Sequence, residues 1–257
     1  MVYEGVFVMS YPDSRRPRVW LLIPLAVAVL LLLYGCVFAR GSGNIVTEER
    51  EVSGFDRIEV RGSGELVVEQ GSEEGVTVRA DDNLMRYIST KVSGDTLIIQ
   101  VGPGNAPASI WPSEPIRYTV RVKELSGLRL SGSTEAVIDG LESGDLEVEV
   151  SGSGDVRIND LEADSLSYDL SGSGSAKMSG SVDDQDVKIS GSGSYDAADL
   201  ESRRASVDIS GSGSTELWVE DALDIQVSGS GSVSYYGSPD VSQQVSGSGS
   251  VEGLGEK

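Results

Sequence analysis

A short repeat governs the second half of this chain. The triplet Ser-Gly-Ser recurs at seven positions spaced 18 to 20 residues apart, and an apolar-x-apolar triplet precedes six of these seven copies. A near-constant period of this length is typical of a solenoid, in which each repeat forms one coil and packs on its two neighbours. Such a fold presents a long repeated surface instead of one pocket. The copies begin at Ser131, Ser151, Ser171, Ser190, Ser210, Ser228 and Ser246.

Alternation within one repeat predicts which side chains face the core. Leu146, Val148 and Val150 share one parity with Gly152 and Gly154, and successive side chains of a strand point to opposite faces. The glycines are therefore expected at core-facing positions, at a narrow or bent edge where no Cβ atom fits. The serines face outward in two hydroxyl ladders. Threonine, which suits an ordered array better because its χ1 is stiff, is missing there, so we interpret the motif as architecture and not as a surface for ice or glycans.

These patterns predict an all-β fold. Residues 126–257 are expected to form a parallel β-helix of seven coils, each of about 18 to 20 residues, and right-handed because parallel crossovers nearly always are. Residues 47–125 are predicted as an irregular β-rich N-terminal block. Residues 40–46 are expected to be a short spacer, flexible at Gly41-Ser42-Gly43-Asn44. Strands are expected at 58–60, 66–68, 76–78, 96–101 and 116–122.

Two details of the N-terminal block are also predicted. One helical turn is expected within residues 81–88, with Asp81 or Asp82 as its cap. The stretch from 102 to 115 holds four prolines and is expected to be a loop. Trp111 lies in that loop, and we expect it to fill a gap in the core.

The N-terminus is predicted to direct export. Residues 1–18 form a basic leader, and the apolar run at 19–39 is predicted as one helix that serves as a signal or transmembrane segment. Three fates stay open. The run Leu33-Tyr34-Gly35-Cys36 is similar to a bacterial lipobox with Cys36 as the lipid-bearing residue; Val37-Phe38-Ala39 fits a cleavage site; or the helix stays uncut as an anchor. All three place the rest of the chain at the extracytoplasmic face of the cell envelope.

Composition excludes several function classes. The chain has 41 acidic and 20 basic side chains and a net charge of -21, which argues against a nucleic-acid partner. It has no histidine, so catalysis by Ser-His-Asp or Cys-His and histidine metal sites are excluded. Its single cysteine allows no intrachain disulfide. We therefore predict no catalytic residue, no metal site and no cofactor.

Carboxylates are the candidates for any remaining chemistry. Asp139, Asp160 and Asp199 recur once per coil, and paired carboxylates can hydrolyse a polysaccharide without histidine. Because the residues recur, we interpret them as a solvated acidic ridge, with Arg203-Arg204 balancing its charge. An enzyme acting on polysaccharide and a divalent-cation-binding envelope protein stay as alternatives. A Leu-Glu step lies close to each aspartate, at Leu141-Glu142, Leu161-Glu162 and Leu200-Glu201.

The N-terminal block carries a family resemblance. The run from Phe55 to Gly71, with Val76-x-Val78 and Gly94-Asp95-x-Leu97-x-Ile99 after it, resembles the auto-transporter adhesin head GIN domain family, a domain of unknown function (DUF2807). The resemblance covers nearly everything from Gly43 to the end. It implies an exported bacterial protein, often a lipoprotein, with a β-helical fold and no catalytic residues to carry over.

The combined prediction is an adhesin-like binding or structural module of the cell surface or periplasm, without enzymatic activity. The membrane is its expected partner through a lipid or an uncut helix, and a protein or a glycan is the expected ligand. Recognition is expected where the coils differ, at Asp155, Tyr195, Trp218 and Tyr236. The end of the chain lacks a capping helix, so the C-terminal coil is expected to self-associate or to meet a partner.

Overall fold

The computed structural model describes residues 38–102 and 109–257, and residues Phe38–Lys257 form one compact unit. The fold is all-β, with 77% of the described residues in strands. The predicted apolar helix at 19–39 and the candidate lipidation residue Cys36 lie outside the described residues, except for Phe38 and Ala39. Those two belong to the short strand β1 (Phe38–Arg40), which pairs in parallel with β7 (Ser109–Trp111), so that end of the predicted helix is extended. Among the described residues, no helix has the length and hydropathy to cross a membrane.

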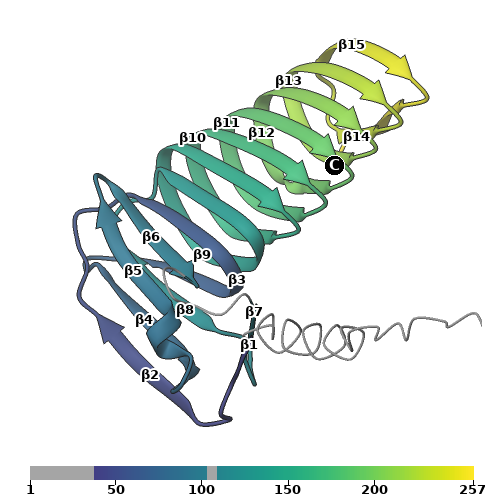
Figure 1. Cartoon of the computed structure of the whole chain (residues 1–257). Helices are drawn as coiled ribbons and strands as arrows, with labels where there is room; N and C mark the ends of the chain where they lie inside the picture. Colours follow the sequence, from purple (N-terminus) through teal and green to yellow (C-terminus); the bar gives the residue numbers. More distant parts are fainter. Residues whose placement is uncertain (1–37, 103–108) are drawn as a thin grey trace, which may run out of the picture. The chain divides into compact units, whose positions relative to one another are not determined.

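The repeats form a β-solenoid, as predicted (Figure 1). Consecutive coils pair in parallel, and the stack has about 6 turns. The prediction of seven coils was wrong. It counted the seven periodic Ser-Gly-Ser copies, but one turn of the solenoid corresponds to the interval between two copies, and seven copies are separated by six intervals. The right-handed winding stays a prediction. The solenoid strands are β9 (Gly127–Gly152), β10 (Asp155–Gly172), β11 (Ser175–Gly191), β12 (Ser194–Gly211), β13 (Ser214–Gly229), β14 (Ser232–Tyr236), β15 (Asp240–Gly247) and β16 (Ser250–Gly255).

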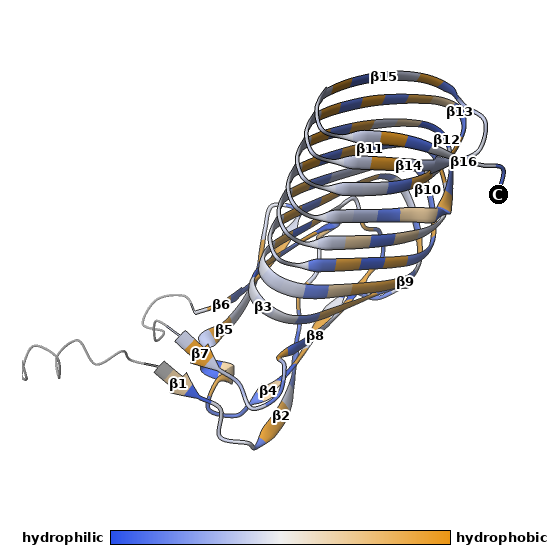
Figure 2. Ribbon diagram, turned by 90° about the vertical axis from the view of Figure 1, so that its right-hand side faces the viewer, coloured by the Kyte–Doolittle hydropathy of each residue, from blue (hydrophilic) through white to orange (hydrophobic). Residues whose placement is uncertain are grey.

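Register and core follow the predicted alternation. Ser151 pairs with Ser171 and Ser171 with Ser190, and the later copies continue the outward ladder. Inward side chains such as Val148 and Val150 are buried, and apolar and polar residues alternate along each coil (Figure 2). Buried side chains therefore form columns along the stack, which remove apolar area from water in every coil at about 25 cal/mol per Å².

The glycines lie where the coil bends. The glycine of each periodic Ser-Gly-Ser triplet has a positive φ, for example +141° at Gly172. A Cβ atom built on Gly172 would overlap with the carbonyl oxygen of Gly152 in the preceding coil. This confirms that no Cβ fits. These glycines are not buried, however, whereas the next glycine is buried in five of the repeats, at Gly154, Gly174, Gly193, Gly213 and Gly231. The positive φ breaks the strand alternation, so only the second column of glycines faces the core.

An antiparallel block covers the N-terminal end of the solenoid (Figure 1). Strand β3 pairs in parallel with the first coil strand β9, and also with β6 and β8. From β8 the sheet continues antiparallel through β4 to β2, while β5 pairs antiparallel with β6. The predicted strands are all present. Their bounds are β2 (Ile45–Arg50), β3 (Arg57–Gln70), β4 (Gly75–Asp81), β5 (Ile88–Ser93), β6 (Thr96–Val101) and β8 (Arg117–Val122).

The predicted spacer is tied to this block. The buried carboxylate of Asp81 accepts hydrogen bonds from the Gly43 N–H at 2.8 Å and from the Ser113 N–H and Oγ at 2.9 and 2.6 Å. Burial alone raises the pKa of Asp81, but these hydrogen bonds outweigh it and the pKa lies below its ordinary value. Neither Asp81 nor Asp82 caps the one-turn 3-10 helix at Met85–Tyr87; Leu84 is at the N-cap position, without a side-chain hydrogen bond.

Candidate functional site

The candidate aspartates Asp139 and Asp199 have other partners, whereas Asp160 is exposed and its N–H donates a hydrogen bond to the Ser179 hydroxyl. Asp139 accepts a hydrogen bond from Asn159 at 2.6 Å, and Asn159 is also its partner in the parallel register. Asp199 pairs in register with Ser179 and accepts a hydrogen bond from the Lys257 ammonium at 2.6 Å. That hydrogen bond and the charge of Lys257 lower the pKa of Asp199. Each of these two carboxylates thus has a neutral or cationic neighbour, and no acid–base pair forms.

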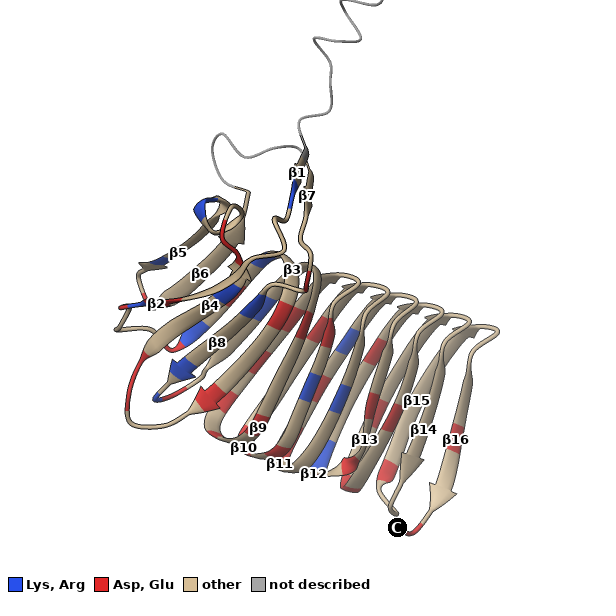
Figure 3. Cartoon of the chain, turned by 90° about the horizontal axis from the view of Figure 1, so that it is seen from below, with Lys and Arg blue, Asp and Glu red and all other residues tan. Residues whose placement is uncertain are grey.

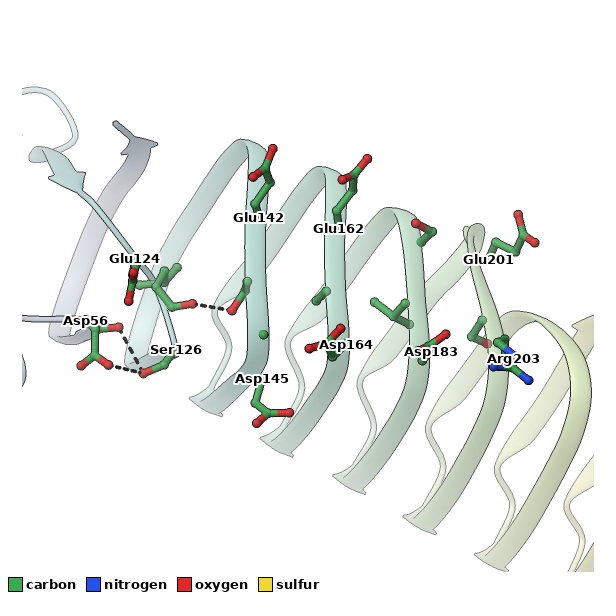
Figure 4. A pocket seen from close by; sticks show the side chains of 17 residues that line it. Asp56, Glu124, Ser126, Glu142, Asp145, Glu162, Asp164, Asp183, Glu201 and Arg203 are labelled. Atoms are coloured by element: carbon green, nitrogen blue, oxygen red, sulfur yellow. Dashed lines mark hydrogen bonds between the residues drawn. The ribbon is translucent and has the colours of Figure 1, made fainter. Parts of the chain in front are cut away.

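A depression lies along the coils that carry these aspartates. It is an open groove of about 880 Å³ that crosses β9, β10, β11 and β12 (Figure 4). Its floor consists of one small side chain per coil, in continuous parallel register. Val182 and Ser202 of this floor are buried. We call this feature the acidic groove, and its floor residues are Ser143, Ala163, Val182 and Ser202.

Carboxylates line both sides of the floor. On one side Glu142 pairs in register with Glu162, and Glu201 continues this column beyond Ser181. On the other side lie Asp164 and Asp183, and Figure 4 shows the two rows on opposite sides of the small residues. The glutamates belong to the Leu-Glu steps that the sequence placed near the candidate aspartates.

Local sequence explains why the groove forms. In β9, four residues separate the buried side chains Leu141 and Leu146. An even number of intervening residues cannot keep strict alternation, so two consecutive residues, Gly144 and Asp145, are exposed. The coil bends there. The small residue at 143 and its equivalents in the next coils sit inside the bend, while the acidic residues around them point outward.

The acidic groove has a strong excess of negative charge. Eight carboxylates and one guanidinium line it, and among the described residues none of these eight carboxylates forms a salt bridge. Arg203 is directed to Asp221, at 3.2 Å, which does not line the groove. The lining carboxylates are Asp56, Glu124, Glu142, Asp145, Glu162, Asp164, Asp183 and Glu201.

Hydrogen bonds satisfy only part of this set. Ser165 donates to Asp145 at 2.5 Å, and Ser126 donates to Oδ2 of Asp56 at 3.0 Å. The second oxygen of Asp56, Oδ1, is buried without a hydrogen-bond partner. An unsatisfied buried acceptor costs about 1 to 3 kcal/mol.

Neighbouring surfaces are neutralised, in contrast to the groove. Arg204 donates two hydrogen bonds to Asp184, at 2.6 and 2.7 Å, and Arg129 does the same to Glu149, at 2.6 Å each. These bonds from arginine lower the pKa of both carboxyls. Figure 3 shows a face on which basic residues lie among the acidic ones across the coils. The acidic groove differs from this face in that none of its carboxylates is paired with a basic side chain among the described residues.

Two aromatic predictions were wrong. Tyr195 is only 1% exposed and donates a hydrogen bond to Gln185 at 3.0 Å, so it packs in the core and cannot contact a ligand. Trp111 is 67% exposed in β7 and fills no gap in the core. Parity alone would have placed Tyr195 in the core, because it lies in register with the buried Ala176. The exposure of Trp111, which lies outside the repeat, could not be predicted in this way.

The other predicted recognition residues are at the surface. Asp155 is exposed and accepts a hydrogen bond from the Ser175 hydroxyl. Trp218 and Tyr236 are half-buried neighbours in register, and the Lys257 ammonium lies 5.2 and 5.6 Å from their ring centroids. Their aromatic faces thus already contact a cation from the same chain.

The described residues give little basis for acid–base or metal chemistry. Every carboxyl there whose pKa departs clearly from its ordinary value has a lowered pKa, whereas a general acid at neutral pH needs a raised one. Within residues 38–102 and 109–257, no group of three or more acidic or cysteine side chains is arranged to hold a metal ion.

Comparisons with known proteins agree with this fold. Residues 54–239 match the family described as "putative auto-transporter adhesin, head GIN domain". A "putative adhesin" from Bacteroides fragilis has a TM-score of 0.78 at 22% identity, covering 84% of this chain and 99% of its own. A "putative lipid binding protein" from Parabacteroides distasonis has a TM-score of 0.68 at 28% identity, with the same coverage.

A "putative adhesin" from Parabacteroides distasonis has a TM-score of 0.66 at 25% identity, over 84% of this chain and 100% of that one. A search among curated proteins finds no match. The family match covers well over half of the sequence, and the resemblance expected from the N-terminal block is confirmed. The chain belongs to the auto-transporter adhesin head GIN domain family.

Proposed function

We propose that this chain is a non-enzymatic, adhesin-like binding module at the extracytoplasmic face of the cell envelope, and that the acidic groove is its contact surface. Membership of an adhesin head family and the likeness to proteins named as adhesins support adhesion and display. The observation that carries the choice of surface is the row of carboxylates, free of salt bridges, along both sides of a continuous floor of small residues.

The chemistry of the groove favours an extended, cationic segment of a protein. Carboxylates recur at the coil separation of about 4.8 Å, and an extended peptide rises about 3.3 Å per residue, so lysines or arginines spread along a peptide can meet several coils. Such a field also accelerates encounter with a cation. The groove lining contains no aromatic side chain on which a sugar ring could stack. A protein ligand is therefore favoured over a glycan.

Attachment to the membrane completes the proposal. The apolar run at 19–39, through a lipid on Cys36 or as an uncut helix, would hold the solenoid at the envelope surface. Intact-mass analysis of protein extracted from membranes distinguishes the two routes. A lipid adduct on Cys36 supports the lipoprotein, a full-length N-terminus supports the anchor, and a soluble product cleaved after Ala39 contradicts attachment.

The two alternative functions have less support. An enzyme acting on polysaccharide needs a carboxyl that stays protonated near neutral pH, and the carboxyls with shifted pKa values are lowered. Divalent cations would be attracted to the acidic groove, but the described carboxylates form no cluster of the kind that holds a metal ion. Calcium is therefore expected to compete with a cationic ligand by screening, without a site of its own.

A salt-dependent binding measurement tests the proposal. A fluorescent peptide of alternating lysine and serine is titrated with the protein, and anisotropy is read at low and high salt. Replacing Glu142, Glu162 and Glu201 by glutamine removes three surface charges, each worth about 0.5 kcal/mol. Affinity should fall about tenfold.

The control keeps the same change in net charge. Asp169, Asp208 and Asp224 are exposed and lie outside the acidic groove. Replacing these three by asparagine should change affinity less than about twofold. An equal loss in both triple variants would attribute binding to the overall charge and would reject the groove as the contact surface. Absence of any binding by the wild-type chain would reject a cationic ligand.

A further inference from the structure

The two ends of the solenoid differ. The antiparallel block covers the N-terminal end, whereas β15 pairs only with β13 and β16 only with β14 among the described residues. Every residue of β15 is exposed. The outer sides of β15 and β16, which we call the open end, therefore present unpaired backbone N–H and C=O groups, the feature that makes an edge strand pair with another chain.

Apolar columns of the core also stop unfinished at the open end. Val241 pairs in register with Leu223 and Val245 with Val227, and each of these partners is 1% exposed. Val241 and Val245 themselves are 39% and 40% exposed. They occupy core positions that no other described coil covers. Between them on the same parity lies Gln243, where the preceding coil has the fully buried Ile225.

The middle of the open end lacks the usual protections of an edge, which occur only at its margins, as Asp240, Glu252 and a register irregularity between β14 and β16. Natural edge strands carry charges, prolines or bulges, or lie under another segment. Residues 241–251 contain no charged side chain, in a chain with a net charge of -21. Figure 3 shows the last coils with few charged residues beside the densely charged ones before them. A surface cleared of charge is suited to meet a copy of itself, because like charges would otherwise repel.

The two described residues after β16, Glu256 and Lys257, do not cover the open end. Lys257 bonds to the carbonyl of Ala198 and the carboxylate of Asp199, both in β12. Its ammonium also lies over the rings of Trp218 and Tyr236. The residues after β16 thus run back along the side of the stack, and the final coil stays accessible.

We propose that the open end binds the open end of a second copy of this chain about a two-fold axis, centred on Gln243. Head-to-tail stacking is blocked because the N-terminal end is covered. A two-fold axis gives a closed dimer, in which the same patch contacts itself. Two coils related in this way wind in opposite senses where they meet, so their strands pair antiparallel, whatever the hand of the solenoid.

One register fits the side chains best. With Gln243 opposite Gln243 of the second copy, Val241 of each chain lies opposite Val245 of the other. The two pairs of valines complete the apolar columns, and the two central amides hydrogen-bond to each other, as stacked glutamines do. The acidic grooves lie on β9 to β12, away from this interface. The dimer therefore presents two grooves and would bind a repetitive surface with avidity.

Sedimentation of the full chain in detergent tests the dimer, and residues 38–257, one compact unit, serve as a second sample without the apolar segment. Both samples should be dimers. Val245→Asp puts a charge into each end of the interface and should weaken dimerisation at least about tenfold. Gln226→Asp adds the same charge one coil earlier, at an exposed position in register with Gln244, and should leave the dimer intact.

Cross-linking tests the register. Gln243→Cys should form a disulfide-linked dimer under mild oxidation, above the background that Cys36 gives in the wild-type chain, and Gln226→Cys should not. A monomer at every concentration, a dimer of the full chain that is lost in residues 38–257, or open-ended oligomers would each overturn the proposal. So would a monomer that instead captures a different protein through Val245.

Discussion

Replacing one corner glycine tests the packing of the coils. Gly172 has a φ of +141°, and a Cβ atom there would fall well inside 3.0 Å of the Gly152 carbonyl oxygen. That oxygen accepts a hydrogen bond from the Ser173 N–H at 2.8 Å. Alanine adds about 1 to 3 kcal/mol of backbone strain. The coils must also separate locally, which weakens this hydrogen bond at about 1 kcal/mol. We therefore expect Gly172→Ala to cost about 2 to 4 kcal/mol.

Two matched variants separate the causes. Gly140 has a φ of +70° and no atom within 4 Å of a built Cβ, so Gly140→Ala adds strain alone, about 1 to 2 kcal/mol. At Gly144 φ is not positive and the nearest atom, Oδ2 of Asp164, is 3.9 Å away. Gly144→Ala should be neutral or stabilising by about 0.4 to 1 kcal/mol, because it restricts the unfolded chain.

Urea and thermal unfolding of residues 38–257, followed by circular dichroism, measure the three variants. For a domain of this size each kcal/mol lowers Tm by about 2 to 4 °C. Gly172→Ala should therefore melt on the order of 10 °C below the wild type, with Gly140→Ala between it and Gly144→Ala. If Gly172→Ala melts together with Gly144→Ala, the coils are not packed as closely as described, and the steric explanation of the repeat is refuted.

Two further predictions concern buried polar groups and the misplaced aromatics. Asp81→Asn should cost about 2 to 4 kcal/mol, since a charged acceptor of three hydrogen bonds is lost. The folded pKa of Asp81 is lowered, so its contribution is complete above the ordinary value of 3.8 and is lost as the pH falls below it; the difference between wild type and variant in urea should shrink in acid. A constant difference down to pH 3 would contradict this. Tyr195→Ala should cost about 3 to 5 kcal/mol and Trp111→Ala less than about 0.5 kcal/mol, and the reverse order in the same assay would restore the roles expected from the sequence.

Most of the solenoid was predictable because its determinants are local and repeat. The parity of residues such as Leu146 and Val150 sets which face is buried, and the Ser-Gly-Ser period sets the register. The buried position of Gly174 followed from parity, whereas the exposed corner at Gly172 did not, because a positive φ interrupts the alternation on which the prediction depended.

The acidic groove was predictable only in part. The sequence revealed that a carboxylate recurs in every coil, but it favoured Asp139 and Asp199, which have neutral or cationic neighbours. The groove uses Glu142 and its equivalents, together with Asp164 and Asp183. Which column borders a hollow depends on where the coil bends, and the bend follows from an even number of residues between two buried side chains. That count is present in the sequence and could have identified the groove.

Photo-cross-linking tests the proposed contact surface most directly. The alternating lysine–serine peptide, with a photoreactive group at its centre, is irradiated with the wild-type chain, and the modified residues are identified by mass spectrometry. The proposal predicts modification concentrated within 142–145, 162–165, 181–184 and 201–203, which line or flank the acidic groove, and its loss at high salt. Modification spread evenly over the surface, or concentrated on the ion-paired face around Arg129 and Glu149, would contradict the assignment of the groove as the binding surface.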